Sequence, residues 1–164
     1  MIRHTDVPCK VTDNLARAHW EKLVWNIPFN RLNVASAAGY DALIHQPSTI
    51  NHQLLTPCLT TDRLLAEARW ARVVRELMLE VIATANALGL GVSESLAEQQ
   101  MSRTSTMGAY KASTLLDFEC GRPLELESLF FEPLRQAQDL GVATPRLAAL
   151  CAVLAALDKR RANL

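Results

Sequence analysis

The sequence has no excess of charge of either sign. Lysine and arginine together number 17 among its 164 residues, and aspartate and glutamate also number 17. Without a net positive charge, the chain has no global attraction for nucleic acid or for an anionic lipid surface. Hydrophobic residues make up 49% and charged residues 21%, which is typical of a globular domain rather than of a disordered segment.

The sequence also lacks the marks of disulfide scaffolds, exported chains and membrane spans. Its four cysteines stand far apart with no CxxC pair, which indicates reduced thiols: Cys9, Cys58, Cys120 and Cys151. The start, MIRHTDVPCK, has no apolar signal region. Charges interrupt every apolar run before the roughly 18 residues that a membrane span needs. We therefore expect a cytoplasmic protein.

No metal-binding or nucleotide-binding fingerprint is present. His45, His52 and Cys58 could be drawn as a cluster, but no two of them stand three or four residues apart, so exposed loop residues are the simpler interpretation. Gly89 and Gly91 resemble the start of a dinucleotide loop. However, the third glycine is missing at Glu94, and the segment follows a predicted helix instead of a strand. We expect no metal site.

The apolar spacing predicts a single all-α domain, a helical bundle over residues 1–164. Its clearest helix runs from about Asp62 to Leu88, about 40 Å long at 1.5 Å per residue, and Gly89 is placed to end it. The predicted core face of this helix comprises Trp70, Val74, Leu77, Val81, Ala85 and Leu88. The predicted solvent face comprises Arg69, Arg72, Glu76 and Glu80.

Further helix boundaries follow from caps and breaks. One helix is predicted from near Asp13 to Val34, and another opens where Ser95 and Glu98 have capping-box spacing. Gly121-Arg122-Pro123 is a break, Pro133 restarts a helix, and Gly141 ends that helix. Thr144 and Pro145 suit the first positions of a last helix. Its predicted core face comprises Leu147, Leu150, Cys151, Leu154 and Leu157.

One line of polar side chains follows the first of these helices. Lys22, Asn26 and Asn30 are spaced by four residues, so each is turned about 40° from the one before. An ammonium group beside two carboxamides could hold a carboxylate and hydroxyl groups. Alternatively, the three residues are simply the solvent side of an amphipathic helix.

A second group of polar side chains surrounds the break at Gly121. It comprises Ser113, Asp117, Glu125 and Glu127. By themselves, the acids after the break suit the first turn of a helix, where the helix dipole favours negative charge.

Taken in order, these motifs resemble the C-terminal domain of ketopantoate reductases (2-dehydropantoate 2-reductases), a fold like the C-terminal part of 6-phosphogluconate dehydrogenase. The resemblance covers about Val11 to Lys159. It rests on Lys22-x3-Asn26-x3-Asn30, on Ser113-x3-Asp117-x3-Gly121-Arg122-Pro123-x-Glu125, and on Gly141-Val142-x-Thr144-Pro145. It implies an N-terminal Rossmann domain that binds NADPH, and a helical domain that contacts the substrate and often forms a homodimer.

The resemblance also implies a role for each matched residue. Lys22 matches the general acid that protonates the keto oxygen, and Asn26 and Asn30 match residues that bind the keto acid. Ser113 matches a hydroxyl that contacts the substrate, and Glu125 matches an acid associated with the cofactor. The sequence departs from the family pattern in three places: Tyr40 replaces an asparagine, a usual glycine is replaced around Phe131, and Pro28 interrupts the helix.

Two functions follow from the resemblance. The first is the substrate-binding half of an NADPH-dependent 2-keto-acid reductase, with ketopantoate as the first candidate, inactive without its nucleotide-binding domain. The alternative is a non-catalytic dimerisation module from a split or degenerate reductase. We expect the homodimer to use the apolar stripe of Leu64, Met78 and Ile82 together with the strip 147–157. The alternative is that both stripes are buried within one bundle.

Overall fold

Helices make up most of the described part of the chain, and no strand occurs there. The computed structural model describes residues 12–45, 55–122 and 131–162. The α-helices are α1 (Leu15–Ile27), α2 (Asn33–Ala35), α3 (Tyr40–Ile44), α4 (Thr61–Ala66), α5 (Ala68–Ala87), α6 (Ser95–Ser105), α7 (Ser113–Glu119), α8 (Glu132–Asp139) and α9 (Pro145–Ala162). A π-helix, η1 (Pro28–Leu32), and a 3₁₀ turn, η2 (Ser36–Ala38), join α1 to α3. The predicted all-α fold is confirmed.

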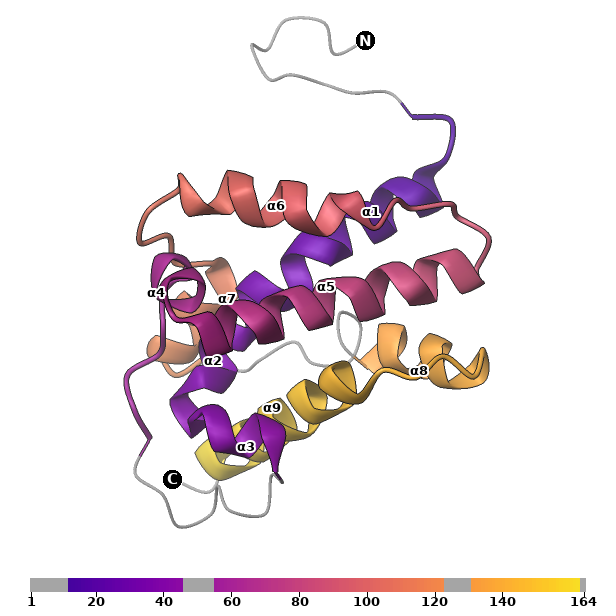
Figure 1. Ribbon diagram of the computed structural model, residues 1–164. Helices are drawn as coiled ribbons and strands as arrows, with labels where there is room; N and C mark the ends of the chain where they lie inside the picture. Colours follow the sequence, from indigo (N-terminus) through magenta and orange to yellow (C-terminus); the bar gives the residue numbers. More distant parts are fainter. Residues whose placement is uncertain (1–11, 46–54, 123–130, 163–164) are drawn as a thin grey trace, which may run out of the picture.

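Helix α5 is the central element of the bundle. It packs against α1, α6, α8 and α9, and Figure 1 shows α6 and α9 on either side of it. Its predicted core residues from Trp70 to Ala85 are buried, whereas Leu88 caps the helix and is 39% exposed. Burial of this face supplies most of the stability of such a helix. None of the described helices has the length and apolar character needed to cross a bilayer.

The apolar stripes that were expected to be exposed lie inside the bundle. Leu64 and Met78 are fully buried, and Ile82 is 1% exposed. Along α9, the residues predicted as its core face are also buried. The prediction that these stripes form an intermolecular interface is therefore wrong, because helices of the same chain cover them.

The predicted helix 62–88 is two helices. Glu67 has an extended conformation (φ −93°, ψ 119°) that separates α4 from α5. Two contacts hold α4 in its own direction: the Thr61 hydroxyl donates to the carbonyl of Gly108 at 2.9 Å, and Leu64 is fully buried. These tertiary contacts outweigh the helical propensity of the segment.

The beginning of α9 is held by two acids of α5. The N–H groups of Arg146 and Leu147 donate to the two carboxylate oxygens of Glu80 at 2.9 and 2.8 Å. The Arg146 guanidinium donates to Glu76 at 2.6 Å. Glu76 and Glu80 thus face α9, not solvent as predicted, and Glu80 satisfies N–H groups that the first turn leaves open.

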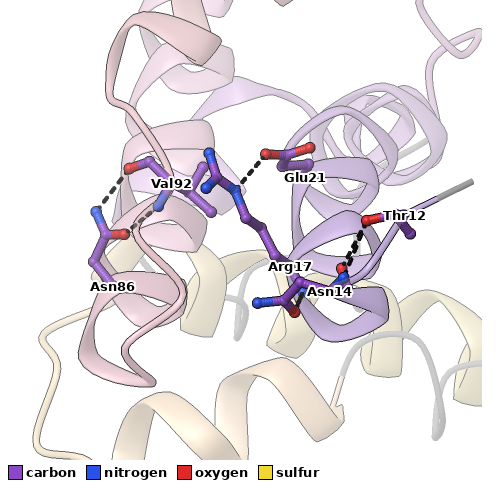
Figure 2. A network of polar contacts seen from close by, with 6 residues as sticks. All are labelled: Thr12, Asn14, Arg17, Glu21, Asn86 and Val92. Atoms are coloured by element: carbon purple, nitrogen blue, oxygen red, sulfur yellow. Dashed lines mark hydrogen bonds and ion pairs between the residues drawn. The ribbon is translucent and has the colours of Figure 1, made fainter.

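Glycines end two helices as predicted. Gly89 (φ 76°) donates to the carbonyl of Asn86 and Leu90 donates to that of Ala85, which is a Schellman motif. Gly141 (φ 68°) follows α8 with the same pair of bonds. After Gly89, the Asn86 side chain exchanges two hydrogen bonds with the backbone of Val92, at 2.9 and 2.6 Å, and so fixes the loop to α5 (Figure 2).

Of two predicted helix starts, the one near Asp13 agrees with the structure and the one at Ser95 differs in its cap. Helix α1 begins after Asn14, whose side-chain oxygen accepts from the Arg17 N–H at 2.9 Å (Figure 2). The predicted capping box at Ser95 is wrong, because Ser95 is already the first helical residue and Glu94 is the N-cap. The Ser95 hydroxyl instead lies 2.8 Å from that of Ser93.

Candidate functional site

The helix that carries Lys22, Asn26 and Asn30 changes type at Pro28. Proline has no N–H to donate to the carbonyl of Val24, so the regular α-helical ladder cannot pass through this position. The chain continues as the π-helix η1, whose turns hold more residues than an α-turn. Each residue then advances by a smaller angle, which brings Asn30 closer to the line of Lys22 and Asn26 than an unbroken α-helix would.

Two carboxamides in this region are enclosed by the fold. The Asn30 side-chain oxygen is buried and has no hydrogen-bond partner among the described residues. Asn33 is 0% exposed, and neither its oxygen nor its nitrogen has a partner within the described ranges. Burying such groups unpaired costs free energy, and turns of this type are frequent at functional sites.

A groove of about 350 Å³ lies between α1 and α6. Its wall on α1 comprises Glu21, Lys22, Trp25 and Asn26, and its wall on α6 comprises Leu96, Gln100 and Arg103. The volume is within the usual range for small-molecule sites, although most of the lining side chains are polar or charged, and only Trp25 and Leu96 are apolar. The structure therefore brings Lys22 and Asn26 together in one groove.

The groove carries positive charge. Within the described ranges, no ion pair or side-chain hydrogen bond engages the Lys22 ammonium or the Arg103 guanidinium. The acid in the groove, Glu21, accepts from Arg17 at 2.9 Å, so its charge is balanced by a neighbour on the same helix. Two cations without a counter-charge can attract an anionic ligand.

Trp25, which lines the groove, attaches α6 to α1. Its indole N–H donates to the Thr104 hydroxyl at 2.8 Å, and that hydroxyl donates to the carbonyl of Gln100 at 2.7 Å. The indole ring also packs on Phe29 and Tyr110, with centroids 5.4 and 6.2 Å away. A partly buried hydrogen bond between the two helices makes the spacing of the two walls specific.

The other predicted site residues that the structure describes, Asn30 and Ser113, are not among those that line the groove. Ser113 is exposed at the first position of α7 and is not among the residues that line the groove. Its neighbour Thr114 accepts from the Arg31 guanidinium at 2.6 Å, so this end of α7 is attached to η1 next to Asn30. Glu125 lies outside the described residues.

Sequence reasoning missed the wall that α6 contributes. Leu96, Gln100 and Arg103 have the spacing of one helix face, i, i+4 and i+7. That spacing was available as a signal. It indicated a site only once α6 was known to pack against α1.

Two of the thiols in the described part of the chain are shielded from solvent. Burial raises the pKa of the Cys58 thiol to about 11 and that of Cys151 to about 12. Both thiols are therefore protonated near neutral pH, which makes them poor nucleophiles and poor metal ligands. Cys120 is exposed and unbridged. Across the described ranges, no three His, Cys, Asp or Glu side chains gather closely enough to hold a metal ion.

Comparison with known proteins gives matches along nearly the whole chain. Residues 53–158 match the family described as "Ketopantoate reductase PanE/ApbA C terminal". A curated 2-dehydropantoate 2-reductase from Nostoc sp. is 31% identical over 154 residues, which are 94% of this chain and 42% of that protein. The chain thus spans less than half the length of this relative.

Solved structures of ketopantoate reductases also match most of this chain. The crystal structure of a 2-dehydropantoate 2-reductase from Methylococcus capsulatus matches with a TM-score of 0.75 and 31% identity, over 92% of this chain and 45% of that chain. One from Geobacter metallireducens matches with a TM-score of 0.72 and 38% identity, over 90% and 42%. A Staphylococcus aureus protein described as a dimeric ketopantoate reductase shares the fold at 22% identity, with a TM-score of 0.68, over 92% and 46%.

Proposed function

Because the chain belongs to the ketopantoate reductase (PanE/ApbA) C-terminal family, we propose that it is the substrate-binding half of an NADPH-dependent 2-oxo-acid reductase. The first candidate reaction is the reduction of 2-dehydropantoate (ketopantoate) to pantoate, as in the names of its relatives. The observation that supports this most directly is the Lys22 ammonium, which has no ion pair among the described residues and lies beside Asn26 in a groove of small-molecule size.

The cofactor would be held mainly by a separate N-terminal Rossmann domain. The described residues contain no strand–glycine-loop–helix unit that could cradle its phosphates, so they do not fit NADPH binding by this chain alone. When bound, NADPH supplies a hydride to the carbon of the keto group.

Lys22 has the chemistry to complete the reduction. As the keto carbon gains hydride, negative charge develops on its oxygen, and a nearby ammonium stabilises that charge before donating a proton. The product is a hydroxyl group, and Lys22 then regains its proton from solvent, to which it is exposed. Asn26 lies in the same groove and can donate to the substrate through its amide.

The other matched residues complete the proposal. Asn30 would bind the polar groups of the keto acid, since its side-chain oxygen still lacks a partner among the described residues. Ser113 would contact the carboxylate from the first turn of α7, and Glu125 would act at the cofactor side of the cleft. We also infer a homodimer, in line with the Staphylococcus aureus protein described as dimeric.

The test joins the chain to its own N-terminal nucleotide-binding domain. We expect no NADPH oxidation by the isolated chain with ketopantoate, and activity from the joined protein. Lys22→Ala in the joined protein should lower kcat/KM by about a hundredfold or more, the usual scale for a general acid. The decrease in NADPH absorbance at 340 nm measures the rate of oxidation in each of these experiments.

Lys159→Ala is the matched control, because it removes one exposed lysine from α9, away from the groove. A loss of less than threefold for Lys22→Ala, with an unchanged circular dichroism spectrum, would show that Lys22 is not the acid. A gene that encodes no such N-terminal domain would favour a non-catalytic association module instead.

A further inference from the structure

The start of α7 is attached to η1 by a buried hydrogen bond. The Arg31 guanidinium donates to the Thr114 hydroxyl at 2.6 Å, although 83 positions separate the two residues. Arg31 follows Asn30 in the chain and Thr114 follows Ser113, so the bond joins the immediate neighbours of two proposed substrate-binding residues. We propose that Thr114 is a positioning residue, which fixes the Ser113 hydroxyl relative to Asn30 for binding of the keto acid. This inference rests on the proposed function.

Both partners of this bond are enclosed by the fold. Arg31 is 4% exposed and Thr114 is 8% exposed. Helix α9 also packs against η1: burial raises the pKa of its Cys151 thiol, and the positive charge of the nearby Arg31 opposes that effect. A hydrogen bond from a charged donor in such surroundings is stronger than a neutral bond at the surface. The guanidinium therefore has little freedom to move away from Thr114.

Helix α7 depends on tertiary contacts for its position. It has seven residues, and isolated helices shorter than about 12 residues are marginal in water. Leu115 anchors α7 in the core, where it is fully buried. The ion pair of Lys111 with Glu119 is exposed to solvent, so it contributes little. Among the polar contacts described for α7, the buried one to Arg31 is therefore best suited to fix its first turn.

Ser113 takes its direction from this first turn. It is the first residue of α7 and is exposed, whereas Thr114 and Leu115 are buried. The N–H groups of Leu115 and Leu116 both donate to the carbonyl of Ala112, at 3.0 and 3.2 Å, which closes the turn. A displacement of about 1 Å in a residue that contacts substrate is enough to weaken the contact. Loss of the Thr114 hydroxyl should therefore act on the substrate through Ser113.

A double-mutant cycle in the joined reductase tests this coupling. Ser113→Ala and Thr114→Val are made alone and together, and kcat and KM for ketopantoate are measured by NADPH oxidation. We expect Ser113→Ala to raise KM about tenfold, the scale of one hydrogen bond to a charged group, with kcat nearly unchanged. Thr114→Val should raise KM by about threefold to tenfold. The double variant should be no worse than Ser113→Ala, because the contact that Thr114→Val weakens is then already missing.

Two further variants separate positioning from a general loss of stability. Thr114→Ser keeps the hydroxyl that accepts from Arg31, so its KM should stay within about twofold of that of the wild type. Thr84→Val is the matched control, because it removes a buried hydroxyl of α5 that donates to the carbonyl of Glu80 at 2.9 Å. It should lower the free energy of unfolding without changing KM.

Amide hydrogen exchange of the chain itself reports on the first turn of α7 without any need for activity. Thr114→Val should speed the exchange of the Leu115 and Leu116 N–H groups about tenfold through local opening of this turn. Thr114→Ser should leave their exchange rates close to those of the wild type.

The two measurements distinguish failure of this inference from failure of the proposed function. Unchanged exchange or an unchanged KM in Thr114→Val would overturn the positioning role, and so would effects on KM that multiply in the double variant. Each of these results would leave the proposed function intact. No reduction of ketopantoate by the joined wild-type protein would contradict the proposed function and, with it, a role of Thr114 in substrate binding. Faster exchange in Thr114→Val would then still show that the bond to Arg31 fixes α7.

Discussion

At the scale of single residues, Asn33 combines complete burial with an unpaired carboxamide. It lies in α2, directly after the π-helix, and none of its side-chain polar atoms has a partner among the described residues. A buried polar group without a hydrogen bond costs about 1–3 kcal/mol relative to the same group in water. The amino-acid sequence does not predict this free-energy cost, because Asn33 has the same spacing as ordinary core positions.

Asn33→Leu tests whether the buried carboxamide lowers the free energy of unfolding. Leucine is similar in size and has no polar atoms, so we expect the variant to raise the free energy of unfolding by about 1 kcal/mol or more. Urea denaturation followed by circular dichroism measures the change. Asn33→Ala is the companion variant, because it removes the amide but leaves a cavity. A loss of stability in Asn33→Leu would show that the amide has a partner and belongs to the site.

The polar residues illustrate what spacing predicts and what it does not. Lys22 and Asn26 were grouped from their positions on one helix, and the structure places both in the groove. Arg103 was not selected, because its neighbour in the site lies 81 positions away in sequence (103 − 22). A single helix face contains both solvent residues and site residues, and only the packing of α6 on α1 distinguishes them.

At the scale of elements, the junction of α5 with α9 depends on one carboxylate. Desolvation raises the pKa of Glu80 above its ordinary value of 4.5, although the N–H groups of Arg146 and Leu147 act in the opposite direction. A raised pKa means that the folded state binds this proton more tightly than the unfolded state does. Between the ordinary pKa and the raised one, the contribution of Glu80 to stability therefore decreases as pH rises.

Glu80→Gln should remove this pH dependence. We expect the free energy of unfolding of the wild type, relative to that of Glu80→Gln, to increase as the pH is lowered from 7 to 4. Urea denaturation at several pH values measures the difference. Glu98→Gln serves as the control, since Glu98 is an exposed partner of Arg75. A difference that decreases toward acid pH would show that hydrogen bonding to the ionised carboxylate, not its desolvation, decides the pKa.

Helix ends were predictable only where a special residue marks them. Gly89 and Gly141 adopt positive φ values that favour glycine, and Pro145 begins α9 as expected. The break at Glu67 has no such mark, because glutamate is an ordinary helix former. It depends instead on tertiary contacts: the Thr61 hydroxyl donates to the carbonyl of Gly108, 47 positions away, and Leu64 is buried in the core.

At the scale of the whole molecule, the burial of both apolar stripes changes what a dimer would need. The surfaces of α5 and α9 that were expected to associate already pack within the chain. Exposed large apolar side chains occur instead around the connection from α6 to α7: Met107, Tyr110 and Leu116, at 42–46% exposure. Scattered exposed residues of this kind are common in monomers, so they do not by themselves define an interface.

The inferred homodimer can be tested by light scattering during size exclusion. We expect about twice the chain mass of 18.1 kDa at micromolar concentration. The mass should fall toward that of one chain on dilution if the association is weak. A single species of 18.1 kDa at every concentration would contradict the dimer, and would not affect the proposal for Lys22.

The fold class itself was the most secure prediction, because helical periodicity repeats over many residues and tolerates local errors. The arrangement of the helices could not be derived in the same way. It depends on side-chain contacts between distant segments, such as Trp25 with Thr104 and Glu80 with the start of α9.

In the segment that contains the π-helix η1, which begins at Pro28, the number of residues constrains the packing of the following helices more than the identity of those residues does. Because a π-helical turn holds more residues than an α-helical turn, the side-chain directions in α2 are shifted by about one residue from those of a continuous α-helix. A further residue inserted between Lys22 and Ile27 would have no second wide turn to accommodate it, and would rotate everything after it by about 100° relative to the start of α1. Leu32 and Val34, both fully buried, would leave the core. In an alignment of close relatives, substitutions should therefore accumulate across this stretch while gaps do not.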